Sequence, residues 1–156
     1  IKKIFLRGLI MKFFFAFIVG LSLSIISLNS FACSCAAPLS IEKGAPRALQ
    51  NASAVFVGVA EKVILADPNH FGDHTYTTFK ITEAFKGPKD SLTTKIITMC
   101  CLCGYSFKEG DKYLVYSGQR KDGSYNASTC GRTKRANSDT EKEIEFLRNL
   151  APHKSH

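Results

Sequence analysis

The sequence predicts a mainly β fold, a small barrel or sandwich that is crosslinked by disulfides and completed by a C-terminal helix. Three observations support this prediction: short segments of strand-like alternation separated by turn residues, a helical pattern near the C-terminus, and 6 cysteines that all follow an apolar leader. An even number of cysteines in an exported chain indicates a disulfide framework, although spacing alone does not decide which cysteines pair.

The first 32 residues have the organisation of a secretory signal peptide. Basic residues precede an apolar run, which extends from Phe13 to Leu28 and contains almost no polar residue except serine. Ser30 and Ala32 supply the small residues that signal peptidase recognises, so we expect cleavage after Ala32. Met11 is the natural start, and we interpret residues 1–10 as upstream reading frame. The mature domain is therefore expected to span residues 33–156.

A transmembrane anchor is the alternative interpretation of the leader. Its apolar run is about 16 residues long, whereas a membrane-spanning helix needs roughly 20. No basic cluster follows the run. We therefore expect no stable membrane span after cleavage, and a protein that is secreted or periplasmic.

Much of the positive charge of the sequence lies in the leader. The whole chain has 21 Lys and Arg against 13 Asp and Glu residues, a formal net charge of +8. Removing the leader removes four basic residues and no acidic one, which leaves 17 basic and 13 acidic residues and a net charge of +4. This scattered excess is typical of a solvated surface and indicates no nucleic-acid partner. The mature chain of about 124 residues has the size of one domain, which we expect to be a monomer.

The strand predictions depend on alternating and β-branched residues. Five segments qualify: Ala54–Leu65, Thr75–Phe85, Leu92–Met99, Tyr113–Tyr116 and Tyr125–Thr129. Gly, Pro, Asp and Asn residues separate them, as is typical of turns. In the second segment, Tyr76, Phe79 and Ile81 are expected to face the core or stack on the sheet. Short strands at this spacing predict a small barrel or sandwich.

Two helices are predicted. Ser138 and Glu141 have the spacing of a capping box, in which Ser138 accepts from a free backbone amide. Ile144, Leu147 and Leu150 then recur at helical spacing. The sequence therefore predicts a C-terminal helix of about three turns with one face on the β fold. A shorter helix is predicted between Ile41 and Asn51.

The new amino terminus has the strongest functional signal. After cleavage the chain begins Cys33-Ser34-Cys35. A free α-amino group has a pKa of about 8, so part of it is neutral at physiological pH. Neutral nitrogen and the carbonyl oxygen of the same residue can form a five-membered chelate with a metal, and a catalytic zinc site keeps an open position for such ligands. Disulfides at Cys33 and Cys35 would hold this terminus rigid, so less affinity would be lost to ordering it.

These residues resemble the tissue inhibitors of metalloproteinases, within the netrin-like group of OB-fold domains. The mature chains of that family open with Cys-x-Cys followed shortly by proline, as Cys33, Cys35 and Pro38 do here. Further similar segments follow in the family's order: Ala48–Gly58, Cys103-Gly104-Tyr105, Tyr113–Gly118, Asp122-Gly123 and Thr129-Cys130. The resemblance covers about residues 33–133. In one departure, Gln50 replaces a cysteine that forms a further disulfide in the animal inhibitors.

The resemblance implies an OB-type Greek-key barrel with the disulfides Cys33–Cys103 and Cys35–Cys130. It also implies a mechanism, in which the amine and carbonyl of Cys33 ligate the catalytic zinc of a protease and displace its activated water. The side chain of Ser34 would enter the adjacent specificity pocket. The chain would hold no metal or cofactor of its own, and we expect it not to be an enzyme.

Several alternatives stay open at the sequence level. Cys33 and Cys35 can be structural crosslinks in a non-inhibitory netrin-like module that binds another extracytoplasmic protein, and acylation of Cys33 would abolish chelation. Cys100 and Cys101 can form a vicinal disulfide, a bond between molecules, or an alternative pairing with Cys33. Cys100 and Cys103 also form a CxxC pair, which makes a thiol-disulfide enzyme a third hypothesis.

Overall fold

The computed structural model describes residues 33–67, 69–70, 73–87, 92–99 and 103–150. The predictions about the leader, Met11, Cys100 and Cys101 lie outside these residues. Two helices and six strands follow one another along the described chain: α2 (Ile41–Asn51), β1 (Ala54–Ile64), β2 (His74–Lys86), β3 (Thr93–Met99), β4 (Lys112–Gln119), β5 (Tyr125–Asn126), β6 (Lys134–Arg135) and α3 (Ser138–Leu150).

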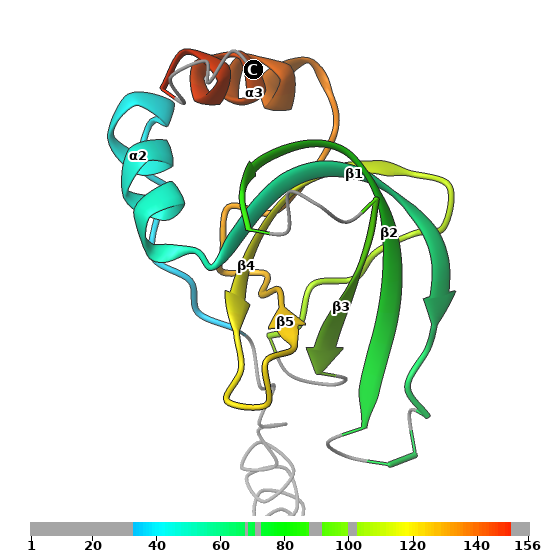
Figure 1. Cartoon of the computed structure of the whole chain (residues 1–156). Coiled ribbons are helices and arrows are strands. Elements are labelled where there is room, and N and C mark those ends of the chain that lie inside the picture. Colours follow the sequence, from blue (N-terminus) through cyan, green and yellow to red (C-terminus); the bar gives the residue numbers. More distant parts are fainter. Residues whose placement is uncertain (1–32, 68, 71–72, 88–91, 100–102, 151–156) are drawn as a thin grey trace, which may run out of the picture. The chain divides into compact units, whose positions relative to one another are not determined.

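The strands close into a five-stranded barrel (Figure 1). The sheet has the order β1-β2-β3-β5-β4-β6. A further pairing of β1 with β4 closes the first five strands of this order into a ring, and β6 pairs with β4 at its edge. β3 and β5 are parallel, whereas the other paired strands are antiparallel. This arrangement is that of a small Greek-key barrel of the OB type. The predicted fold class is therefore confirmed, and the barrel is the correct choice over the sandwich.

Strand β1 closes the barrel because it bends. Its pairing with β2 shifts register at three places, between Val55 and Phe56, between Val57 and Gly58, and after Ala60. Such bulges increase twist and curvature, which lets one strand pair with β2 along its length and with β4 over its first half. At Gly58 the neighbouring strand comes close, since a Cβ atom there would lie 2.8 Å from the carbonyl oxygen of Lys80.

The barrel interior is an aromatic core. Phe79 is fully buried, and its ring packs edge-on against Phe56, Phe107 and Tyr113 at centroid distances of 5.6, 4.8 and 6.1 Å. Aromatic pairs in this geometry contribute stabilisation beyond that from the apolar area that they bury. Tyr76 and Ile81, which were predicted together with Phe79, are only half-buried, and Ile81 packs against this core.

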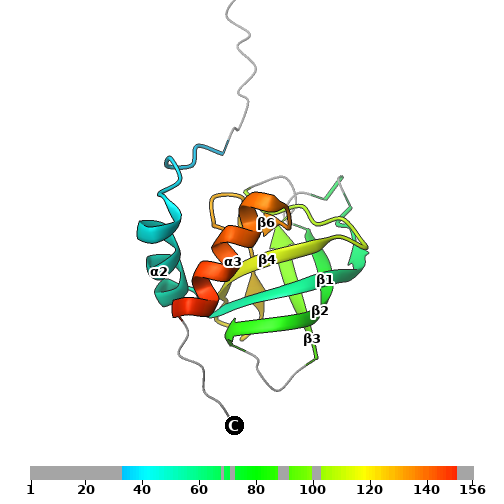
Figure 2. The same ribbon diagram turned by 90° about the horizontal axis from the view of Figure 1, so that it is seen from above.

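A second core lies between the outside of the barrel and the two helices. Figure 2 shows α2 and α3 beside β1 and β4. The buried residues of this second core are Ala45, Val55, Val57, Leu114, Tyr116, Ile144 and Leu147. Since Ala54 and Phe56 face the barrel interior, the first half of β1 is covered on both faces. This explains why the sequence from Ala54 to Ala60 is continuously apolar rather than alternating.

Some predicted details are wrong. The helix α3 is capped by Asn137 and not by Ser138, because the Asn137 Oδ1 atom accepts from the backbone amides of Asp139 (3.1 Å) and Thr140 (2.9 Å). Ser138 is instead the first helical residue. Leu150 is 40% exposed and does not extend the buried stripe. The last predicted strand is only two residues long, and β6 was not predicted.

Candidate functional site

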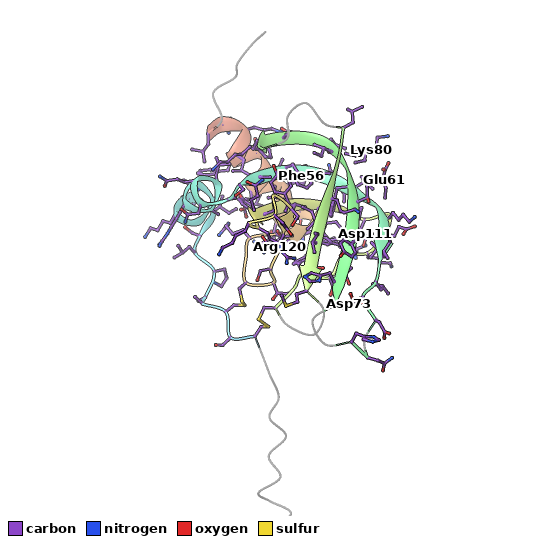
Figure 3. All side chains as sticks on the ribbon, turned by 60° about the horizontal axis from the view of Figure 1, so that its bottom comes forward. Phe56, Glu61, Asp73, Lys80, Asp111 and Arg120 are labelled. Atoms are coloured by element: carbon purple, nitrogen blue, oxygen red, sulfur yellow. A yellow bond between two sulfur atoms is a disulfide. The ribbon has the colours of Figure 1, made fainter. Side chains whose placement is uncertain are left out.

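The segment 33–40, called here the arm, lies on the surface ahead of α2. Every residue of the arm is exposed, and none belongs to a helix or strand. Two disulfides nevertheless attach it to the barrel (Figure 3), namely Cys33–Cys103 and Cys35–Cys130, with Cα distances of 5.7 and 5.1 Å. These are the two pairings that the family resemblance implies. The backbone at the start of the arm is therefore fixed while its side chains face solvent.

The two loops that hold the arm are themselves joined. The carbonyl oxygen of Cys103 accepts from the backbone amide of Thr129 (2.9 Å) and from its hydroxyl (3.2 Å). Gly104 and Ser128 form an isolated antiparallel bridge beside this contact. Both disulfides therefore attach the arm to one hydrogen-bonded support, and we expect Cys33 and Cys35 to keep a constant position relative to each other.

Arg132 holds the far end of the arm. Its Nη1 atom donates to the carbonyl oxygen of Leu39 (3.0 Å), just before α2 begins. The rest of its guanidinium forms a bidentate pair with Glu143 of α3, through Nε to Oε1 (2.7 Å) and Nη2 to Oε2 (2.8 Å). Arg132 also follows Cys130 by two positions, so the arm, the disulfide loop and the C-terminal helix meet at one side chain.

Glu143 is a buried carboxylate, and its hydrogen-bonding and ion-pair partners stabilise its negative charge. Besides Arg132 it accepts from the Tyr116 hydroxyl (2.8 Å), and the Lys134 ammonium lies 3.7 Å away. Burial raises the pKa of Glu143, but the hydrogen bonds from Arg132 and Tyr116 outweigh it, so its pKa lies below the usual range. Burial and the nearby carboxylate raise the pKa of Tyr116, which therefore stays protonated and donates. A paired and hydrogen-bonded carboxylate of this kind is a rigid structural element.

A shallow groove of about 640 Å³ runs between the arm, α2, the end of β4 and the loop 128–132. Pro38 and Leu39 form its wall on the arm side, and Arg47 lies on the α2 side. Arg47 is exposed and pairs with no carboxylate among the described residues. A molecule that contacts the arm would therefore meet this mixed apolar and basic surface as well.

The structure places the predicted site residues Cys33 and Ser34 on the exposed arm and adds residues that the sequence did not reveal. Arg132 and Glu143 are 11 positions apart and carry no motif. A signal was available in α3, because Glu143 is adjacent to Ile144 and four positions before Leu147, on the apolar side of the helix. An acid on the buried face of a helix requires a cationic partner.

The described part of the chain has neither a metal-binding cluster nor a membrane-spanning helix. It contains no group of three or more His, Cys, Asp or Glu side chains arranged to hold a metal ion. Neither α2 nor α3 has the length and apolar character that crossing a bilayer requires. Comparison of the sequence with models of known protein families and with curated proteins gives no match.

Proposed function

We propose that the mature chain is an exported inhibitor of zinc metalloproteinases that acts through a free amino group on Cys33. One observation carries this proposal: the arm is exposed at every residue, yet it is held at Cys33, Cys35 and Leu39. A segment that is exposed and also fixed loses little conformational entropy on binding. The two disulfides are also compatible with an oxidising, extracytoplasmic compartment.

The chemistry follows from the position of Cys33 at the start of the mature chain. Its neutral amine and its carbonyl oxygen would ligate the catalytic zinc of the protease and displace the water that the metal activates. The metal belongs to the protease and not to this chain. Ser34, whose side chain is exposed, would enter the adjacent specificity pocket. The support for this proposal is the disulfide pairing and the barrel topology, which are those that the family resemblance implies.

The decisive experiment is an inhibition titration against a panel of zinc metalloproteinases. It compares protein that begins at Cys33 with protein that carries one extra alanine before Cys33. The matched control carries the extra alanine after His156 instead. Because the added residue acylates the Cys33 amine, we expect it to weaken inhibition at least about 100-fold, as loss of a central binding contact does, while the control inhibits normally.

The outcomes separate the alternatives. Equal inhibition by both amino-terminal forms would refute chelation through Cys33 and direct attention to the groove beside the arm. No inhibition by any form, with normal thermal unfolding, would favour a netrin-like module that binds another protein without blocking a protease. Finding an acyl group on Cys33 of the exported protein would exclude the chelation mechanism.

A further inference from the structure

We propose that the outer face of β1, β2 and β3 docks an acidic amphipathic helix of a partner protein. This face, called here the lysine face, consists of Lys62, Lys80, Lys95, Ile64, Tyr76, Ile97 and Met99. It belongs to different residues from the arm and does not depend on the proposed inhibition. Figure 3 labels Lys80 on β2.

Strand register places these side chains in two adjacent rows. Thr78 pairs with Lys62 on one side and with Lys95 on the other, which makes a row of two lysines around a threonine. Tyr76 pairs in the same way with Ile64 and Ile97, which makes an apolar row. Phe79 and Ile96 face the barrel core, so alternation directs both rows outward. Met99 follows Ile97 on the same side of β3, in the next row beside His74, and Lys80 follows Thr78 on the same side of β2, in the next row beside Thr93.

The charges of the lysine face are uncompensated. None of Lys62, Lys80 and Lys95 forms an ion pair with a carboxylate among the described residues. The Lys95 ammonium lies instead 5.3 Å from the centroid of the Tyr76 ring, which links the two rows. Glu61 lies at the β1 bulge near this face, but it is exposed and pairs with none of these lysines. The face therefore favours a partner with negative charge.

The apolar row determines the kind of partner. Ile64 is 51% exposed and Met99 40% exposed, and a polyanion would leave both uncovered. Neighbouring strands are about 4.8 Å apart, close to the roughly 5.4 Å rise of one helical turn. A helix lying across the strands would thus place an apolar residue from successive turns on Ile64, Tyr76 and Ile97. Acidic residues on one flank of that helix would face the lysine row.

The test is a fluorescence anisotropy titration of the exported protein with a labelled peptide of about 20 residues, long enough to form a helix. The peptide carries leucine at helical spacing and glutamate on both flanks. The variant K62E/K80E/K95E should bind it about tenfold more weakly than the native protein. The matched control, K43E/K108E/K121E, has the same net charge but changes exposed lysines outside the face, and it should bind within about twofold of native.

Four results would overturn the proposal: equal weakening in the control variant, equally tight binding of polyglutamate, no effect of changing Ile64 and Met99 to serine, or no binding of the peptide. A fifth would replace it, namely binding to vesicles of phosphatidylglycerol and phosphatidylcholine without binding to the peptide, which would identify a lipid surface. The K62E/K80E/K95E variant should inhibit proteases as the native chain does if the arm acts as proposed, so the two proposals fail separately.

Discussion

Replacing Glu143 by glutamine should destabilise the protein by about 3 kcal/mol, because it removes one partner of a buried ion pair. The side chains of Arg132 and Glu143 are only 13% and 1% exposed, so the Arg132 guanidinium would lose its counter-charge where water cannot replace it. The change also weakens the hydrogen bond from Tyr116. For a domain of this size, a loss of about 3 kcal/mol corresponds to a fall in Tm of roughly 10 °C.

The chain offers a matched control on the same helix. Arg148 and Glu83 form the same bidentate pair, with distances of 2.9 and 2.7 Å, but their side chains are 48% and 32% exposed. Glu83→Gln should therefore cost under about 1 kcal/mol. Urea unfolding with the disulfides intact measures both values. A cost for Glu143→Gln no greater than that for Glu83→Gln would refute the inference that burial makes the Arg132 pair important.

Three further predictions concern other parts of the molecule. Replacing Cys35 and Cys130 together by serine removes a crosslink between residues 95 positions apart and should lower the free energy of unfolding by about 3 kcal/mol, because the remaining Cys33–Cys103 disulfide already shortens the loop; unchanged urea unfolding would contradict a structural role for this disulfide. The stability of the native protein should fall on acidification relative to that of Glu143→Gln. Burial raises the pKa of Glu143, but Arg132 and Tyr116 bring it below the unfolded value of about 4.3. The ionised Glu143 side chain therefore contributes its full stabilisation above about pH 4.3, and this contribution is lost as the pH falls through the folded-state pKa. Parallel pH profiles for the two proteins would contradict this assignment. Gly58→Ala should cost about 1–3 kcal/mol, because the new Cβ would lie 2.8 Å from the Lys80 carbonyl oxygen; a thermal melt within 1 °C of native would show that β1 and β2 separate easily.

The barrel was predictable because its signals are local. The residues Ala54–Ile64 and His74–Lys86 alternate or carry β-branched side chains, and turn residues flank them. Helix α2 has the predicted bounds, Ile41–Asn51. The pairing of the cysteines required more than composition, and it came only from the resemblance to a known family.

The parts that were missed depend on contacts between distant segments. Arg132 and Glu143 meet only because the loop after β5 and helix α3 pack on the same side of the barrel. The lysine face exists only once the registers of β1, β2 and β3 are known, since its residues lie on three separate strands. Asn137 and Ser138 are both good N-cap residues, so the sequence alone does not distinguish them; in the structure Asn137 takes the cap position.

The burial of the first half of β1 on both faces has a consequence for cooperativity. Ala54 and Phe56 belong to the aromatic core, while Val55 and Val57 belong to the core under the helices. Neither core can open without exposing one side of the same strand, so the barrel and the helices should unfold in a single transition. Native-state hydrogen exchange should then show its slowest amides in the first half of β1, with opening free energies equal to that of global unfolding.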